Sequence, residues 1–360
     1  MWRYFEEEGV PASYALAMDE FLTNAYRSSG VMPDPTLRLY TFRPHCALLG
    51  RFQHAASEVR LDQCHEAGVE VNRRQTGGGT MMMGQGQLAV SFFASAQRDH
   101  VPKSLAAILD TYGRVMVRAM RRLGLEAELN ERGHLLADGK RLGACAAFMD
   151  KEEAVLFQAW LIVSLDMPLV LRVLCLPDFP DPEVAAMAIM EEMTTLSKVK
   201  GQAMEMAVVR KHVRGTFEAA FGIEFQDFAV TPLEASRAQE IERSRYGTGA
   251  WIYDRTPAPD MVGRGVVSTP GGTLRVYAAA RSDIVESVLI TGDFHGLVEV
   301  VTAIELALRR CPAIYDEIRR RIQENLAPGS IVGISSLELS SVVTEAVRNA
   351  LGRSHTSLTG

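Results

Sequence analysis

The sequence lacks several features that mark common protein classes. Its five cysteines are odd in number, widely scattered and without CxxC spacing, which excludes a disulfide framework and a zinc knuckle. A basic surplus is also missing, since 38 Lys and Arg face 44 Asp and Glu for a net charge of -6. This balance argues against broad binding to a nucleic-acid backbone, so we expect small-molecule or protein partners.

No apolar run is long enough to indicate a membrane span. The most apolar region, 154–176, is interrupted by Gln158, Asp166 and Arg172, and we predict two buried elements there. The N-terminal segment MWRYFEEEGV is acidic and has no apolar core, unlike a signal peptide. Together with the scattered cysteines, these features predict a cytoplasmic protein that has no membrane partner.

Metal-ligand spacing is missing as well. The eight histidines, among them His45, His54, His65 and His134, do not occur in an HExxH motif or a comparable pattern. We therefore expect no metal site built by the protein alone.

The 360 residues, 47% of them apolar, are enough for two domains. Helical periodicity predicts a helix over 101–123, and Asp138-Gly139 predicts a turn between two strands. Two further strands and helices at 297–310, 313–326 and 335–351 predict a second α+β module. We predict an α/β (α+β) protein with domains at 1–230 and 235–352 and a loose tail at 353–360.

The segment NRRQTGGGTMMMGQGQLAVSFF, 72–93, contains the most informative motif. Three consecutive glycines leave backbone N–H groups unshielded, which suits close contact with phosphate or carboxylate oxygens, and two arginines supply countercharge. The spacing matches neither GxxxxGK[ST] nor GxGxxG. From these residues alone, a plain glycine turn remains an equal alternative.

Several motifs occur together in an order that resembles the lipoate–protein ligase A family. They are AMDE, LRLYTFRPHCALLGRFQ, RRQTGGG, DGKRLGACA, RYGTGAWIYD and VESVLITGDFHG. The resemblance covers about residues 1–225 as a catalytic domain and about 235–350 as an accessory domain.

This resemblance implies the fold of biotin and lipoate ligases, with a mixed, largely antiparallel sheet, flanking helices and a smaller α+β accessory domain. It also implies a two-step reaction in which ATP, with Mg²⁺, activates lipoate or octanoate to an acyl-adenylate. The acyl group then passes to a lysine of a lipoyl carrier domain, which resembles glycine cleavage H protein or a dehydrogenase E2 domain. The accessory domain is expected to swing between the two steps.

The resemblance implies a set of site residues. Those expected to bind the substrate or adenylate are Arg73, Arg74, Thr76, Gly77, Gly78, Gly79, Gln87 and His134. Backbone amides and guanidinium groups fixed around a phosphoryl or anhydride oxygen would stabilise the charge that develops there. The candidates for an apolar acyl tunnel are Met81, Met83 and Gln158, although methionines that alternate along a strand also suit a core.

The sequence departs from the family pattern where the reacting groups are expected. The family's catalytic lysine aligns with Arg141, and Lys140 lies one residue earlier, so both are candidates for the catalytic role. One step along a strand reverses the side-chain direction, so Lys140 can substitute only if a bulge intervenes. His134 stands in place of an aspartate, and Trp160 in place of a threonine adds volume.

These departures leave two other hypotheses open. One is a homologue that binds an acyl group or carrier protein without catalysis. The other is an octanoyl or lipoyl transferase that uses Cys145 as its nucleophile, for which Lys140 and Arg141 would lower the thiol pKa. A buried structural thiol is the simpler interpretation of Cys145. For the pair Asp19-Glu20 we expect a solvated or capping role.

Overall fold

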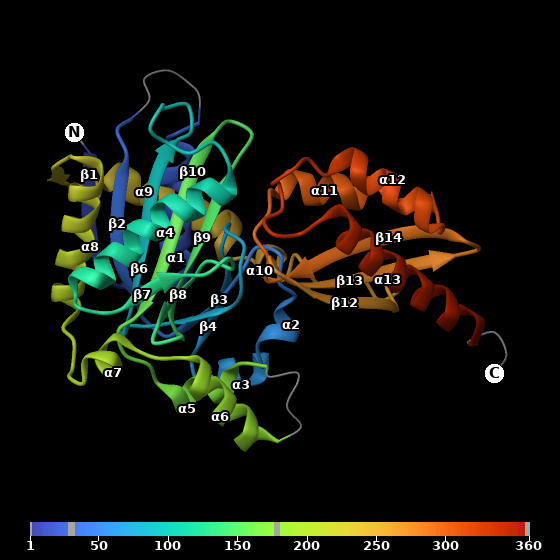
Figure 1. Ribbon diagram of the computed structural model, residues 1–360, viewed down its shortest axis with the longest axis horizontal. Coiled ribbons are helices and arrows are strands. Elements are labelled where there is room, and N and C mark those ends of the chain that lie inside the picture. The colour runs from blue at the N-terminus through green and yellow to red at the C-terminus, as the bar shows by residue number, and fades with distance from the viewer. Residues whose placement is uncertain (1, 28–32, 176–180, 357–360) are drawn as a thin grey trace.

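The structure is a computed structural model that describes residues 2–27, 33–175 and 181–356. It has two parts, each built on its own main β-sheet, and the C-terminal part lies beside the N-terminal one (Figure 1). The predicted α/β (α+β) fold class is confirmed.

The N-terminal part is built on an eight-stranded sheet in the order β11-β1-β2-β6-β10-β9-β8-β7. Strand β1 pairs in parallel with β2 and β11, and the other neighbours pair antiparallel. The strands are β1 Trp2–Val10, β2 Thr36–Phe42, β6 Gln87–Ser95, β7 Ala127–Leu129, β8 His134–Ala137, β9 Lys140–Met149, β10 Ala154–Ile162 and β11 Phe225–Asp227.

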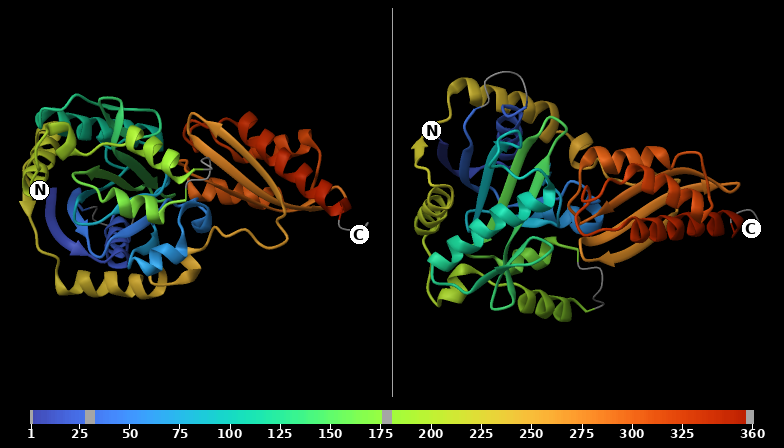
Figure 2. Two further views of the ribbon diagram at one scale, coloured as in Figure 1. Left: turned by 90° about the horizontal axis from the view of Figure 1, so that it is seen from below. Right: turned by 45° about the horizontal axis from the view of Figure 1, so that its top comes forward.

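Helices cover both faces of this sheet (Figure 2). Helices α4 Leu105–Arg122 and α8 Met206–Phe221 pack on one face and build the largest apolar core. Helices α1 Ala12–Asn24 and α9 Pro232–Ile241 pack against each other on the opposite face. The helix predicted at 101–123 is confirmed as α4, which begins after Ser104 because its side chain accepts a hydrogen bond from the Ala107 amide.

The apolar segment 154–176 forms two elements, as predicted. Strand β10 is buried along its whole length between β6 and β9, and α5 Met167–Val173 follows it. A central strand with both faces covered needs no alternation of polar and apolar residues, which explains the composition. Across the described parts of the chain, no helix is both long and apolar enough to cross a membrane.

A small three-stranded sheet carries the glycine motif. Its strands are β3 Cys46–Leu49, β4 Glu70–Arg73 and β5 Met81–Met83, in the order β4-β3-β5, and the glycine loop 74–80 connects β4 to β5. The short helices α2 Ala55–Glu58 and α3 Leu61–Glu66 pack with α5 against this sheet. Of the two helices that follow α5, α6 Pro182–Glu192 contacts β9, and α7 Leu196–Lys200 places Leu196 in the core of the main sheet.

The C-terminal part is a four-stranded sheet covered by helices on one side (Figure 1). Its strands are β12 Gly263–Thr269, β13 Gly272–Arg281, β14 Ile284–Gly292 and β15 Cys311–Pro312. Its helices are α11 Val298–Ala307, α12 Tyr315–Asn325 and α13 Ser336–Thr356. The helix α13 includes the first four residues of the predicted loose tail, and 357–360 lie outside the described residues.

The boundary between the two parts differs from the predicted position. Residues 232–252, comprising α9, the π-helix η1 Glu242–Tyr246 and α10 Gly249–Ile252, pack on the N-terminal part. Tyr246 is buried there, donates to the Glu20 carboxylate at 2.9 Å, and its carbonyl accepts from Asn72 at 2.9 Å. The accessory sheet therefore begins only at Gly263. The capping box at Thr231 marks a helix start, which we took for a domain start.

A buried ion network joins α1 to the centre of the main sheet. The Asp19 carboxylate, 2% exposed, accepts hydrogen bonds from four side chains: Arg38, Tyr40, Ser91 and Gln158. Arg38 is fully buried and also pairs with Glu7. The prediction of a solvated or capping role for Asp19 is wrong, because its register on α1 directs it into the sheet.

We expect Asp19→Ala to lower the free energy of unfolding by about 3–5 kcal/mol, because it removes one of the two carboxylate partners of a buried guanidinium and the acceptor of three further buried side chains. Urea denaturation followed by circular dichroism measures the loss. Asp110→Ala is the control, since Asp110 pairs with Arg114 on the solvent face of α4 and its loss should leave the midpoint unchanged. Equal urea midpoints for the two variants would contradict the role of Asp19 as the centre of a buried ion network.

Candidate active site

The glycine loop is held from inside by Arg74. This side chain is 1% exposed, and its guanidinium donates to the Leu48, Gly77 and Gly79 carbonyls, each at 2.7 Å. It also donates to the Thr76 hydroxyl at 3.1 Å. A planar fork of donors fits several carbonyls at fixed angles, so Arg74 sets the loop's shape.

The Arg73 side chain also binds backbone carbonyls. Its guanidinium donates to backbone carbonyls of two segments, 50–51 and 251–252, at 2.8–3.2 Å. Burial lowers the pKa of both arginine side chains. The structure therefore places Arg73 and Arg74 beside the glycine loop but directs their donors at protein carbonyls, where the resemblance implied adenylate oxygens.

Close backbone approach explains the glycines at this loop. A Cβ on Gly50 would lie 1.8 Å from the Gly78 carbonyl oxygen, and one on Gly77 would lie 2.3 Å from the Phe294 oxygen. Gly78 has φ +85°, a conformation that side chains rarely adopt. Its amide donates to the Phe294 carbonyl at 3.0 Å. The loop thus places the Gly78 amide against an oxygen of the accessory part, and the role of 77–79 in binding substrate stays a prediction.

Thr76 and Gln158 connect the loop to the buried ion network. The Thr76 hydroxyl donates to Gln158 Oε1 at 2.7 Å, and Gln158 Nε2 donates to Asp19 at 2.7 Å. Both side chains are buried with their polar atoms satisfied. Gln158 therefore positions the loop.

The predicted acyl tunnel is a packed core. Met83 and Trp160 are 0% and 1% exposed and share one cluster with Tyr40 and Phe42, and Met81 packs at its edge. Arg74 lies over the Trp160 ring, 4.7 Å from its centroid. The structure shows no open channel at Met81, Met83 and Gln158, because the indole of Trp160 occupies the interior that a smaller residue would leave open. An acyl tunnel at these residues stays a prediction.

Gln87 lies away from the loop. It begins β6, and its side-chain amide donates to the Ser164 carbonyl just beyond β10. It anchors a strand end, so its assignment to the substrate site is not supported by its contacts.

The β8–β9 hairpin places Arg141 and His134 on one face. Arg141 pairs with Leu136, and since residues 134 and 136 share a face, Arg141 lies on the His134 side. A bulge does occur, but at Leu142, beyond both candidates. Lys140 pairs with Ala137, whose side chain faces the core under α4, and therefore lies on the opposite face. Of the two candidates, Arg141 is the one directed at the site.

The loop 293–296 of the accessory part completes this site. The His295 ring is fully buried, and its Cε1 would lie 3.0 Å from a Cβ on Gly78. Phe294 stacks on Phe52 of the N-terminal part with ring centroids 4.6 Å apart. The motif VESVLITGDFHG contains these residues, but a single sequence does not indicate which loops meet across domains, so it predicts no role for them in the site.

Burial and neighbouring guanidinium groups favour the neutral form of the two histidines in this cluster. Burial lowers the pKa of His295 to about 4, and the Arg74 guanidinium adds to the effect. Burial likewise lowers the pKa of His134 to about 4, with the Arg141 and Arg132 guanidinium groups contributing. Arg141, about one-third exposed and 3.9 Å from Glu192, is an accessible cation of the cluster, as is the partly exposed Arg132.

Cys145 does not resemble a nucleophile. It is 2% exposed within the largest apolar core, and burial raises its pKa well above the usual range for a thiol. The hypothesis of a transferase that uses Cys145 is therefore not supported by the structure.

A family model for the lipoyl protein ligase A/B catalytic domain matches residues 11–218, more than half of the chain. The chain belongs to this family. The match also places it among enzymes of the lipoyl ligase and acyltransferase type and confirms the resemblance stated above.

Relatives and solved structures support the assignment. The octanoyltransferase LipM of Brevibacillus brevis is 24% identical over 71% of this chain and 99% of its own length. A bi-partite lipoate protein ligase of Thermoplasma acidophilum, solved in a study of that ligase and its E2 lipoyl domain, has TM-score 0.63 and 25% identity and covers 71% of this chain and 98% of that one. The LipL1 structure of P. falciparum in complex with lipoate covers 97% of this chain and all of that one, with TM-score 0.76 and 14% identity, which shows the fold alone.

The neutral histidines predict a pH dependence of stability. A histidine whose pKa is lowered by folding binds protons more readily when unfolded, so stability is full above pH about 6.5 and falls toward pH 4. Between pH 7 and pH 5 the histidines lower the thermal midpoint, whereas the raised pKa of Glu58 acts in the opposite sense in every variant. We therefore expect His295→Phe to have a smaller drop in midpoint, or a larger rise, than the wild type over this pH range.

Differential scanning calorimetry at the two pH values checks this expectation. His65→Gln is the control, because His65 is exposed on α3 and its variant should keep the wild-type change in midpoint. A change that is the same in His295→Phe and in the wild type would contradict the role of the interface histidine.

Proposed function

We propose that the chain attaches a lipoyl or medium-chain acyl group to a lysine of a lipoyl carrier domain. The observation that carries this proposal is the glycine cradle at 77–79, whose amide at Gly78 is engaged only by a backbone oxygen of the accessory part, among the described residues. A carbonyl oxygen there is an acceptor that an acyl or phosphoryl oxygen can replace. Withdrawal of the accessory loop would open the cradle.

The ATP-dependent ligase reaction is the first candidate. The octanoyltransferase relative covers 71% of this chain at 99% of its own length, and the bi-partite Thermoplasma ligase chain covers the same 71%, so this coverage does not separate the two activities. The likeness to LipL1 extends over both parts. An enzyme that activates its own acid needs two arrangements of one site, which a hinged accessory domain provides.

The proposed co-substrate is ATP with Mg²⁺. One acidic residue lies beside the glycine loop, since a Cβ on Gly79 would lie 3.6 Å from Cβ of Asp293, although Asp293 Oδ1 already accepts a hydrogen bond from the Thr273 amide at 2.5 Å. Mg²⁺ held through phosphates needs only one or two carboxylates, so these residues fit the ion. The guanidinium of Arg141 would then take the electrostatic role of the family's lysine, binding oxygens on the His134 face.

The proposed partner is a lipoyl carrier domain of the dehydrogenase E2 or glycine cleavage H protein kind. The Thermoplasma ligase was studied together with its E2 lipoyl domain, which supports this class of partner. On the sequence features described first, we propose a cytoplasmic location.

The test is an intact-mass assay of a carrier domain incubated with the protein, ATP, Mg²⁺ and either lipoate or octanoate. We expect a mass increase of one acyl group, and its loss in Gly78→Val, because the Cβ branch is strained at φ +85° and fills the cradle. Gly215→Val on α8 is the control, since nothing lies within 4 Å of its added Cβ. Calorimetric binding of carrier without any mass shift or pyrophosphate would replace this proposal with a binding function.

Octanoyl transfer from a preformed acyl donor is the second candidate, supported by the name of the octanoyltransferase relative. Octanoylated acyl carrier protein in place of ATP and octanoate tests it in the same assay. Because Cys145 is buried in apolar surroundings, we expect Cys145→Ala to retain the mass shift with either donor. Loss of the shift in a folded Cys145→Ala protein would restore the cysteine hypothesis.

A further inference from the structure

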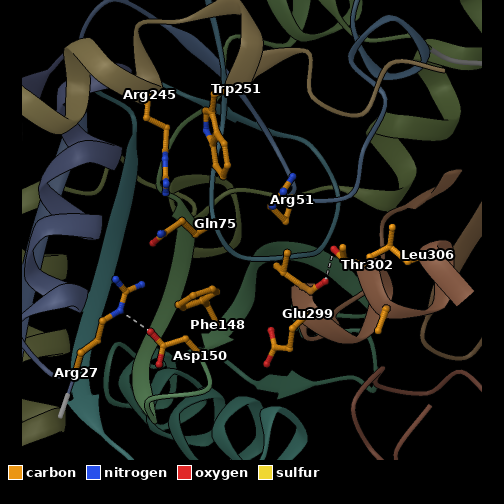
Figure 3. Close-up of a pocket in the computed structure, with 12 residues that line it drawn as sticks. Arg27, Arg51, Gln75, Phe148, Asp150, Arg245, Trp251, Glu299, Thr302 and Leu306 are labelled. Atoms are coloured by element: carbon orange, nitrogen blue, oxygen red, sulfur yellow. Dashed lines mark hydrogen bonds and ion pairs between the residues drawn. The ribbon is translucent and has the colours of Figure 1, made fainter. Parts of the chain in front are cut away.

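A cavity of about 480 Å³ lies where the N-terminal part, the connecting helices and α11 meet. This volume is within the range of small-molecule sites, about 300–1,000 Å³. Figure 3 shows side chains from all three segments directed toward it. It adjoins the glycine loop through Gln75, the residue before Thr76, and is separate from the filled interior around Trp160.

On one wall of the cavity, the positive charges of the arginines are already paired with carboxylates. Trp251 lies between two guanidinium groups, with Arg51 4.8 Å and Arg245 5.0 Å from its ring centroid (Figure 3). Its Nε1 donates to the Arg73 carbonyl at 2.8 Å. Each arginine of the lining already pairs with a carboxylate: Arg51 with Asp254, Arg245 with Glu20, and Arg27 with Asp150. A ligand carboxylate would have to compete with these partners.

Gln75 supplies the polar group that a ligand would meet. It is 9% exposed, its side chain points toward the cavity, and within 2–27, 33–175 and 181–356 its Oε1 has no hydrogen-bond partner. A buried carbonyl oxygen left without a donor destabilises the free protein, and a bound donor would remove that cost. Since a carboxamide both donates and accepts, its natural complement is another amide.

The remaining surface is apolar and reaches solvent. Phe148 and Val298 line the cavity, and Leu306 of α11, 58% exposed, lies at its rim with Glu299 and Thr302. An exposed leucine beside a cavity presents apolar surface that an aliphatic chain would cover. The open rim on α11 also lets a chain enter from outside.

We propose that this cavity binds an aliphatic acyl amide, with the amide at Gln75 and the chain along Phe148, Val298 and Leu306. The inference rests on the proposed function and deepens it, because an acyl group joined to a carrier lysine is such an amide. The cavity then holds the acylated lysine arm beside the glycine loop after transfer. A free acyl amide has the same chemistry, so both sources are tested.

Isothermal titration calorimetry on the full chain measures binding of octanamide, octanoate and N-acetyl-N6-octanoyl-lysine methylamide. We expect both amides to bind at least tenfold more tightly than octanoate, because a carboxylate lacks an N–H for Gln75 and meets guanidinium groups that are already paired. Tighter binding of the lysine derivative than of octanamide would assign the carrier arm as the source. Equal binding would assign a simple acyl amide, and equal or tighter binding of octanoate would overturn the proposal.

Two variants test the location. Leu306→Trp fills the rim and Gln75→Leu removes the amide, and each should weaken octanamide binding at least tenfold. Leu337→Trp is the matched control, because Leu337 is 56% exposed at the start of α13, away from the cavity. Since Leu306 is at the surface, its variant keeps the test valid if Gln75→Leu fails to fold. Unchanged octanamide binding in folded Leu306→Trp would overturn the location.

Failure of the proposed function is distinguishable from failure of this inference. Amide binding with the expected variant effects, but no mass shift of any carrier, would retain the cavity as a site and reject acyl attachment. If the carrier gains the acyl mass but octanamide does not bind, acyl attachment is retained and this site is rejected. The same conclusion follows if Leu306→Trp and Gln75→Leu both leave the octanamide affinity unchanged.

Discussion

The buried guanidinium of Arg74 is the constraint on which the site depends. Its hydrogen bonds to Leu48, Gly77 and Gly79 hold the glycine loop in one shape, and the close approach of Gly50 to Gly78 leaves no room for an alternative. Burying a charge is costly unless every donor is satisfied, and here backbone carbonyls satisfy the donors. An arginine that appears in sequence as a ligand for substrate therefore acts as a support for the main-chain amides that face the ligand.

The docked accessory loop follows from that shape. A loop with glycines at 77 and 78 leaves a depression that the 293–296 segment fills, with one hydrogen bond to Gly78 and the His295 ring against it. Additional contacts between the two parts, such as the Phe52–Phe294 stack and the Glu58–Arg275 pair, stabilise this arrangement. Burial raises the pKa of Glu58 to about 7 in spite of the Arg275 guanidinium, so that pair is not an optimised one.

Local patterns in the sequence were sufficient for much of the fold. The periodicity of α4, the Asp138-Gly139 turn and the glycine motif each depend on neighbouring residues, and the structure contains all of them. The errors concern long-range packing. Asp19 was misread because its partners Arg38 and Gln158 are distant in sequence, and the segment 232–252 was misplaced because the burial of Tyr246 against Glu20 leaves no local trace. The partners of Arg73 and Arg74 could not be predicted for the same reason, since only the fold reveals which carbonyls surround the two guanidinium groups.

The substitutions at 158 and 160 belong together. Trp160 fills the interior where the resemblance implies an acyl chain, and Gln158 ties the loop to Asp19 in the same layer. The region behind the loop is therefore a packed core in which Gln158 is hydrogen-bonded, whereas Trp160 Nε1 has no partner among the described residues. A pocket that has been filled this completely is not opened by small side-chain motions, because displaced core residues lose packing at a cost of several kcal/mol. An acyl chain that reaches the glycine loop must then approach from its other side. The cavity lined by Gln75 lies next to that loop, and its rim on α11 is open. An acyl chain could approach the loop through this rim instead of through the filled interior.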